Sequence, residues 1–234
     1  MDLTTVLSNT MLSKDLYLIR VKHDNAAKMG QFYMLRAWGT YPLLSRPISV
    51  FDSDGLTVSF LYRTVGEGTQ LFSALREGDK LTLAGPYGNS FPTVSGRVAM
   101  VGGGVGIAPL YLAAKTLKQA DPSVSIHLFL GFGDAAVLTE EFRAVCDTLT
   151  VEVGGYITDS VDCTQYDVLF SCGPTPMMKA LHRRCKDSAA LLYVSLESRM
   201  ACGIGACLGC SCPTVDGNRR ICKDGPVFLA REVF

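Results

Sequence analysis

The placement of cysteine constrains this chain of 234 residues more than any other feature of its sequence. Nine cysteines are present, none occurs before residue 146, and five fall between Cys202 and Cys222. A disulfide framework usually shows an even number of cysteines at regular spacings along a small domain. An odd number crowded into one short stretch instead indicates a local site that uses thiolates.

The spacing within this stretch indicates an iron–sulfur site. Cys202, Cys207 and Cys210 follow the order C-x4-C-x2-C, and eleven residues separate Cys210 from Cys222. This is the ligand order of plant-type [2Fe–2S] proteins. Cys212 is left out, because using it would leave a single residue between two ligands. Zinc and free thiols are the alternatives, although zinc favours two well-separated pairs of cysteines. The remaining cysteines are expected to be buried, unreactive thiols: Cys146, Cys163, Cys172 and Cys185.

The first 95 residues are typical of a small antiparallel β barrel. Residues 16–21 alternate between the two faces of a half-buried strand. Asp54-Gly55 is a hairpin-turn signal, and a helix is predicted at 70–76 with Gly78 as its stop. Many short strands separated by turns favour a barrel. Further strands are predicted at 31–36, 47–51, 57–65 and 80–84.

The pattern changes at Ser95-Gly96, after which strands and helices alternate. This alternation predicts a doubly wound parallel sheet, and the Gly- and Cys-rich residues from 197 onward interrupt it. The chain is therefore expected to divide into a barrel domain (1–95), an α/β domain (96–196) and a cluster-binding segment (197–234). Strands are predicted at 97–101, 125–130, 149–153, 167–172 and 191–196, with helices ending near 120 and at 138–146 and 176–186.

A glycine-rich loop follows the first parallel strand and opens a helix. Glycine lets the backbone approach a diphosphate closely, and a helix N-terminus favours negative charge. The loop therefore predicts a dinucleotide site, with an ordinary strand-to-helix turn as the alternative. Its candidate residues are Gly102, Gly103, Gly104 and Gly106.

A second turn, Cys172-Gly173-Pro174, follows the fourth parallel strand. It is expected at the carboxyl edge of the sheet, where ligands of such folds bind, and Cys172 is a candidate to face a nicotinamide there. Asp134 follows the second strand. It is predicted either to bond a ribose hydroxyl, which favours NAD over NADP, or to cap a helix that begins at Ala135.

Anion-binding residues also occur in the barrel region. Arg46 and Arg63 offer planar forks of donors that suit phosphate, and Ser49 offers a hydroxyl to a polar ring atom. Gly68 and Thr69 come just before the predicted helix, where free N–H groups favour an anion. Each residue has an ordinary structural explanation when it is taken alone, and the set gains weight only beside the nucleotide loop.

Composition excludes several other classes of protein. The 22 basic and 22 acidic residues give no net charge, so a nucleic-acid-binding role is not expected. The longest uncharged run, 98–114, has 17 residues and contains glycines and a proline, so no membrane span is predicted. Without a secretory signal at the N-terminus, the cytoplasm, where thiols stay reduced, is the expected location.

These blocks, in this order, resemble the ferredoxin–NADP reductase superfamily. Within it they are most similar to the electron-transfer subunits of dihydroorotate dehydrogenase B. The most specific parts are residues 197–210, with the sequence ESRMACGIGACLGC, and 222–228, with the sequence CKDGPVF. Ile48 stands where many superfamily members have an aromatic residue on the flavin, as is usual in the dihydroorotate branch.

The resemblance implies three sets of site residues and no catalytic residue on this chain. The scattered histidines, His23, His127 and His182, form no acid–base pair, which fits proton abstraction on a partner. FAD would bind at Arg46, Pro47, Ile48, Ser49, Leu61, Tyr62, Arg63, Gly68 and Thr69. NAD would bind at Gly102, Gly103, Gly104, Gly106, Cys172, Gly173 and Pro174. A [2Fe–2S] cluster would be held by Cys202, Cys207, Cys210 and Cys222.

The resemblance also implies an activity. The chain would be the electron-transfer subunit of an NAD-dependent dihydroorotate dehydrogenase in pyrimidine biosynthesis. Electrons would pass from the FMN of a catalytic partner through [2Fe–2S] and FAD to NAD+, in a heterotetramer with two copies of each subunit. The alternatives are a reductase subunit of a sulfide dehydrogenase or hydrogenase diaphorase, a free-standing ferredoxin-type reductase and a non-catalytic zinc module.

Overall fold

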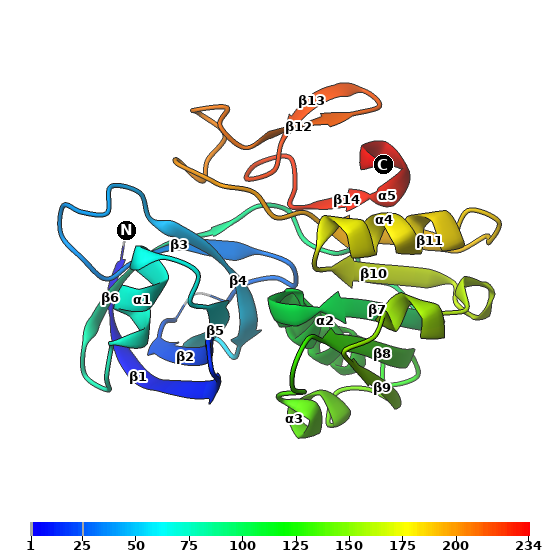
Figure 1. The fold of residues 1–234 in the computed structure, drawn as a ribbon, viewed down its shortest axis with the longest axis horizontal. Helices are drawn as coiled ribbons and strands as arrows, with labels where there is room; N and C mark the ends of the chain where they lie inside the picture. Colours follow the sequence, from blue (N-terminus) through cyan, green and yellow to red (C-terminus); the bar gives the residue numbers. More distant parts are fainter. Residues whose placement is uncertain (1, 25) are drawn as a thin grey trace.

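A computed structural model describes residues 2–24 and 26–234. The N-terminal half forms a β barrel, the central part forms a twisted sheet beside it, and the C-terminal segment lies across the top of both (Figure 1). None of the helices in the described ranges is long and apolar enough to cross a membrane.

The barrel is antiparallel and closes in the order β1-β2-β5-β4-β3-β6. The predicted strands are present with shifted ends, but β1 was not predicted. Its sequence gives a poor signal because Leu3 and Met11 point to solvent, whereas Thr4 points inward. The strands are β1 (Asp2–Ser13), β2 (Leu16–Lys22), β3 (Phe32–Arg36), β4 (Arg46–Ser53), β5 (Thr57–Arg63) and β6 (Lys80–Tyr87).

The helix predicted at 70–76 is displaced: α1 spans Glu67–Ser73. Thr69 causes the early start, because its hydroxyl accepts hydrogen bonds from the backbone N–H groups of Val65 (2.9 Å) and Gly66 (3.2 Å). The same hydroxyl donates to the Gly66 carbonyl at 2.8 Å. Gly68 and Thr69 therefore belong to the first turn of the helix and do not precede it.

The central sheet has the order β14-β11-β10-β7-β8-β9. Helices α2 (Ala108–Ala120) and α3 (Thr139–Arg143) share a buried core with the barrel, while α4 (Thr175–Arg184) packs with the opposite face of the sheet. The parallel strands are β7 (Arg97–Gly103), β8 (Ser125–Phe132), β9 (Thr148–Val153), β10 (Val168–Cys172) and β11 (Leu191–Ser195). Short 3-10 turns occur at η1 (Gly104–Ile107), η2 (Ile157–Ser160) and η3 (Cys163–Gln165).

The C-terminal segment departs from the expectation of a purely parallel sheet followed by a separate segment. Its strand β14 (Val227–Leu229) returns to the sheet and pairs antiparallel with β11. Three consecutive apolar residues make this possible, because β14 is covered on both faces. The segment also contains the hairpin of β12 (Ser211–Thr214) and β13 (Gly217–Arg220), and the short helix α5 (Ala230–Val233).

Two of the cysteines expected to be free thiols are paired. Cys163 in η3 and Cys185 at the end of α4 form a disulfide, with Cα atoms 5.3 Å apart. Both lie in the core between α4 and the sheet, so packing brings them together. Cys146 and Cys172 are free.

Candidate functional site

A cleft of about 660 Å³ opens where the barrel, the central sheet and the C-terminal segment meet. Its volume lies within the ~300–1,000 Å³ usual for cofactor sites. The barrel contributes Phe32, Leu44, Ser45, Arg46, Pro47, Ile48, Ser49, Leu61, Tyr62, Arg63, Val65 and Thr69. The sheet side contributes Val105, Ala108 and Leu196, and the C-terminal segment contributes Glu197, Ser198, Arg199, Met200 and Pro226. The residues predicted from the Arg46–Ser49 and Leu61–Arg63 blocks thus lie in one cleft.

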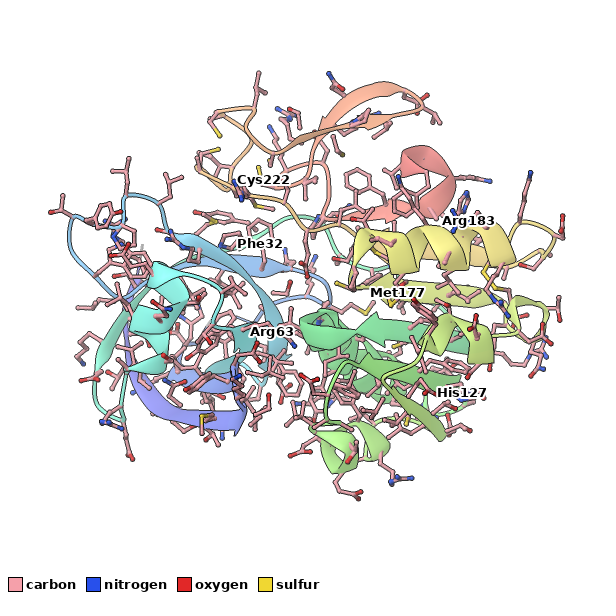
Figure 2. All side chains as sticks on the ribbon, in the orientation of Figure 1. Phe32, Arg63, His127, Met177, Arg183 and Cys222 are labelled. Carbon is pink, nitrogen blue, oxygen red and sulfur yellow. A yellow bond between two sulfur atoms is a disulfide. The ribbon has the colours of Figure 1, made fainter. Side chains whose placement is uncertain are left out.

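Three arginines line the cleft, and two of them, Arg46 and Arg63, come from the barrel. The Arg46 guanidinium lies 5.2 Å from the centre of the Trp38 ring, and Gly68 leaves room for it, since a Cβ there would be 2.6 Å from its Nε. Arg63, labelled in Figure 2, lies between the barrel and the sheet, where a Cβ on Gly104 would be 4.0 Å from its guanidinium. Arg63 also pairs with Asp15 at 3.5 Å. Both arginines are placed to meet an anion.

Tyr62 forms part of the cleft wall and is fixed from behind. Its hydroxyl donates to the Asn9 side-chain oxygen at 3.0 Å, and its ring stacks on Tyr17 with centroids 5.6 Å apart. Burial raises the pKa of Tyr62 well above its ordinary value, so the phenol stays neutral. Tyr62 is 1% exposed, so it forms a rigid backing for the cleft wall and does not exchange a proton.

The glycine-rich loop and the Cys172–Pro174 turn lie against each other. Parallel pairing places Cys172 opposite Gly102, at the carboxyl ends of adjacent strands. A Cβ on Gly106 would come within 2.5 Å of both the Cys172 carbonyl oxygen and the Gly173 Cα. The predicted nucleotide residues are therefore gathered at one edge of the sheet, and Gly106 is required for their closeness.

Cys172 is fully enclosed, with 1% of its surface exposed. Burial and the neighbouring charge of Glu197 raise the pKa of its thiol, so it is a neutral side chain and not a nucleophile. Burial likewise raises the pKa of Glu197. Glu197 lines the cleft but was not predicted as a site residue. The available signals were its position directly after the fifth parallel strand and its place at the start of the specific 197–210 block.

One of the two predictions for Asp134, that it caps a helix beginning at Ala135, is wrong. It lies in an exposed loop beyond the carboxyl end of β8, and α3 begins only at Thr139. Leu138, with a φ of 57°, immediately precedes that helix and delays its start. A ribose contact at Asp134 remains a prediction.

The four candidate cluster cysteines are arranged as two pairs. The Cys207 N–H donates to the Cys202 sulfur at 3.4 Å, and the Cys222 N–H donates to the Cys210 sulfur at 3.4 Å. The Gly209 N–H donates to the Cys207 sulfur at 3.5 Å. Backbone amides aimed at sulfur are the outer shell expected of a thiolate site. Among residues 2–24 and 26–234, no three Cys, His, Asp or Glu side chains gather around one point as a single metal ion requires.

Cys202 and Cys222 differ in their acidity. Backbone N–H groups, first that of Cys207 and then that of Ile204, lower the pKa of Cys202 to about 6. Burial, together with Cys210, raises the pKa of Cys222 to about 12. Binding iron at Cys222 must therefore release a proton, whereas Cys202 is prepared as a thiolate. The four thiols are a donor set that fits an iron–sulfur cluster. Cys212 is a half-buried free thiol, and burial raises its pKa as well.

The cysteine loop is packed directly onto the outside of the barrel. Phe32 and Met200 belong to the same buried cluster as Cys210 and Cys222, and both also line the cleft. Figure 2 shows Phe32 below Cys222 and above the position of Arg63. Phe32 and Met200 thus belong both to the cleft lining and to the buried cluster that holds Cys210 and Cys222.

The histidines lie outside the cleft. His23 bonds the Tyr33 hydroxyl inside the barrel at 3.1 Å, His127 bonds Thr150 and Tyr166 at 2.8 Å each, and the His182 ring lies near the C-terminus. None of these three histidines is among the residues that line the cleft.

Known structures share this arrangement. The structure of an NADH-dependent reduced ferredoxin–NADP oxidoreductase, described for flavin-based electron bifurcation, superposes with a TM-score of 0.90. It covers 100% of this chain and 90% of its own, at 28% identity. A ferredoxin NADP+ reductase of Neisseria gonorrhoeae with bound FAD and NADP superposes with a TM-score of 0.67 at 14% identity, covering 83% of this chain and 98% of its own, which shows the fold alone. The fold is the FAD-binding fold of the ferredoxin–NADP reductases.

Sequence relatives identify the family. Residues 197–234 match the iron-sulfur cluster binding domain of dihydroorotate dehydrogenase B. The electron transfer subunit of dihydroorotate dehydrogenase B (NAD(+)) from Clostridium acetobutylicum is 39% identical over 97% of this chain and 95% of its own length. The corresponding subunit of Bacillus velezensis is 39% identical over 98% of this chain and 97% of its own. The chain therefore belongs to the electron-transfer subunits of the NAD-dependent dihydroorotate dehydrogenase B and is the oxidoreductase subunit that serves a catalytic partner.

Proposed function

We propose that this subunit passes electrons from the FMN of its catalytic partner to NAD+, by way of a [2Fe–2S] cluster and FAD bound to the chain itself. Nicotinamides exchange two electrons at once and iron–sulfur clusters one, and a flavin between them does both. The protein's part is to fix the order and closeness of the three sites. The FAD site is proposed to lie in residues 1–95, the NAD site in 96–196 and the cluster site in 197–234. The last strand of the third part is shared with the sheet of the second.

The cleft is the proposed site of FAD. Arg46 and Arg63 would neutralise the diphosphate, and Tyr62 would support the planar ring system. Ser49 would donate to a ring nitrogen, with Pro47, Ile48 and Leu61 as apolar walls. Gly68 and Thr69 would act through the backbone, because the Thr69 hydroxyl is already used to start α1.

The nucleotide would bind at the carboxyl edge of the sheet. Gly102, Gly103, Gly104 and Gly106 would let its phosphates approach the backbone, and Cys172, Gly173 and Pro174 would shape the nicotinamide end. Cys172 is enclosed and neutral, so its proposed role is to fill space behind the ring and not to react. Val105 and Ala108 come from this edge and line the FAD cleft, which supports contact between the two ligands.

The single observation that carries the proposal is the shared layer of Phe32 and Met200. These side chains line the cleft on one side and pack with Cys210 and Cys222 on the other. Ligands held by Cys202, Cys207, Cys210 and Cys222 would thus be separated from the cleft by one side chain. This spacing supports direct exchange of electrons between the two sites.

The assembly and location are also part of the proposal. We propose a heterotetramer of two electron-transfer and two FMN-containing subunits, in the cytoplasm, without nucleic acid or membrane as partner. Sedimentation of the purified complex, combined with flavin analysis for FMN and FAD, would give the stoichiometry. Equal amounts of both flavins in a species of four chains are expected, and any other ratio would contradict the proposed assembly.

Paired cysteine variants test the relay. Cys207→Ala is expected to remove the visible absorption of the cluster and abolish electron transfer to the partner, while NADH still reduces the bound FAD. Cys212→Ala is the matched control, because it removes a neighbouring thiol that the proposal leaves free. It should keep the cluster and full transfer. Normal transfer in Cys207→Ala, or loss of the cluster in Cys212→Ala, would refute the proposed ligand set.

A further inference from the structure

The loop that joins β3 to β4 is held rigid by one side chain. The Arg36 guanidinium donates to the carbonyl oxygens of Trp38 (3.1 Å), Gly39 (3.0 Å), Thr40 (3.1 Å) and Leu43 (2.7 Å). Its centre also lies 5.6 Å from the Trp38 ring. A loop whose only task is to connect two strands does not need its backbone fixed in this way.

The rigid loop presents apolar side chains to solvent. Tyr41 and Leu43 are 72% and 74% exposed. Leu44 is also exposed, but it lines the FAD cleft and has a separate role. Pre-ordered apolar groups at the surface are a typical means of binding another protein, because little conformational freedom is lost on association.

The cysteine loop shows the same combination beside it. Ile204 and Leu208 are 55% and 61% exposed, and Cys207 between them is exposed as well. Leu208 has a φ of 59°, a conformation that a bulky side chain rarely adopts. An apolar side chain held outward in such a conformation at a binding site indicates a contact role.

The two loops belong to one face of the molecule. Gly203 is packed against β3, since a Cβ there would be 2.9 Å from the Met34 side chain. Side chains two residues apart share a face of a strand, so Arg36 lies on the same side of β3 as Met34. Both loops project at the upper left in Figure 1. Residues 36–45 and 198–215 contain no acidic side chain, whereas Arg36 and Arg199 are basic, although the whole chain has no net charge.

We propose that Tyr41 and Leu43, with Ile204 and Leu208, form a docking face for the FMN-containing catalytic subunit, which would offer an apolar patch bordered by carboxylates. This inference rests on the proposed function, because electrons must cross between subunits at the exposed edge of the cysteine loop. Ile204 and Leu208 flank that edge at Cys207, and the excess of basic over acidic groups in the two loops complements an acidic border. The β3–β4 loop thus serves as a docking arm that adds apolar contact beside the point of electron exchange.

The test is the double variant Tyr41→Ser/Leu43→Ser in the full-length subunit, titrated against the catalytic subunit of the same organism. Its Kd is expected to rise at least about tenfold, as loss of two central apolar contacts usually causes. Reduction of a soluble dye by NADH should be unchanged, since it needs only the cleft and the nucleotide site. Leu3→Ser/Leu56→Ser is the matched control, because these residues are 70% and 73% exposed elsewhere on the barrel, and it should bind like wild type.

Each outcome of this test has a defined meaning. If both double variants bind the partner with wild-type affinity, the docking proposal is wrong while the proposed function stands. If wild type binds no FMN-containing partner, both fail. A wild-type chain that pairs with itself through this face, shown by dimers that Tyr41→Ser/Leu43→Ser abolishes without changing affinity for the partner, would also overturn the proposal. Should the double variant lose its FAD, Leu43→Ser alone provides the measurement, with a smaller rise in Kd of about threefold expected.

Discussion

Gly106→Ala is the sharpest test of how the nucleotide site is built. The new methyl carbon would lie 2.5 Å from the Cys172 carbonyl oxygen and from the Gly173 Cα. Non-bonded atoms normally approach to ~3.5–4.0 Å, so the two loops would have to separate by about 1 Å. Overpacking of this kind costs about 1–3 kcal/mol, which corresponds to a fall in Tm of roughly 2–12 °C for a chain of this size.

The same displacement should be visible in the reaction with NADH. A shift of about 1 Å in a positioning loop can lower a rate on the order of 100-fold, so kcat/KM for NADH-driven dye reduction should fall by about ten- to a hundredfold. Gly39→Ala is the control, because a Cβ there meets nothing within 4 Å. It should leave the rate unchanged and raise stability by at most ~1 kcal/mol, through the less flexible unfolded chain. Wild-type Tm and kcat/KM in Gly106→Ala would refute the argument that these loops must touch.

Three further predictions concern other parts of the fold. Backbone N–H groups lower the pKa of Asp54 to about 2 from its usual 3.8, so its stabilising contribution is complete above pH ~4 and is lost as the pH falls through 2. Asp54→Asn should therefore unfold more readily than wild type at pH 7 in urea titrations, and this difference should shrink as the pH is lowered to 2. The Cys163–Cys185 disulfide closes a loop with a sequence separation of 22. It should therefore add about 3 kcal/mol to the free energy of unfolding. Dithiothreitol should remove that contribution from wild type and have no effect on Cys163→Ser. Phe32→Leu should lower the free energy of unfolding by up to ~1.5 kcal/mol. In stopped-flow traces it should slow electron exchange between FAD and the cluster more than reduction of FAD by NADH. Equal slowing of both steps would argue against the role of Phe32 between the two sites.

Much of the site was predictable because its chemistry depends on residues close together in sequence. Two short patterns can be recognised in the sequence alone: the spacing of Cys202, Cys207 and Cys210, and the block beginning at Arg46. The alternation of strands and helices likewise predicted the central sheet, since each βα unit is a local pattern.

The remaining features depend on contacts between distant residues. Phe32 is an ordinary strand residue in the sequence, and only the folded chain places it between the cleft and the cysteines. The alternation of apolar and polar residues expected of a strand is not visible in β1, because some of its apolar side chains face solvent. The disulfide also arises from tertiary structure, so no spacing rule could have revealed it.

The return of β14 to the central sheet has a consequence for how this family can change. Because β14 covers β11, a chain truncated after residue 196 would lose the five cysteines from Cys202 onward and also leave a hydrogen-bonding edge open to other chains. Open edges of this kind invite aggregation. The C-terminal segment that carries these cysteines therefore also covers one edge of the central sheet. A lineage that discarded the cluster would have to retain Val227–Leu229, or replace it with another cover, to keep the protein soluble.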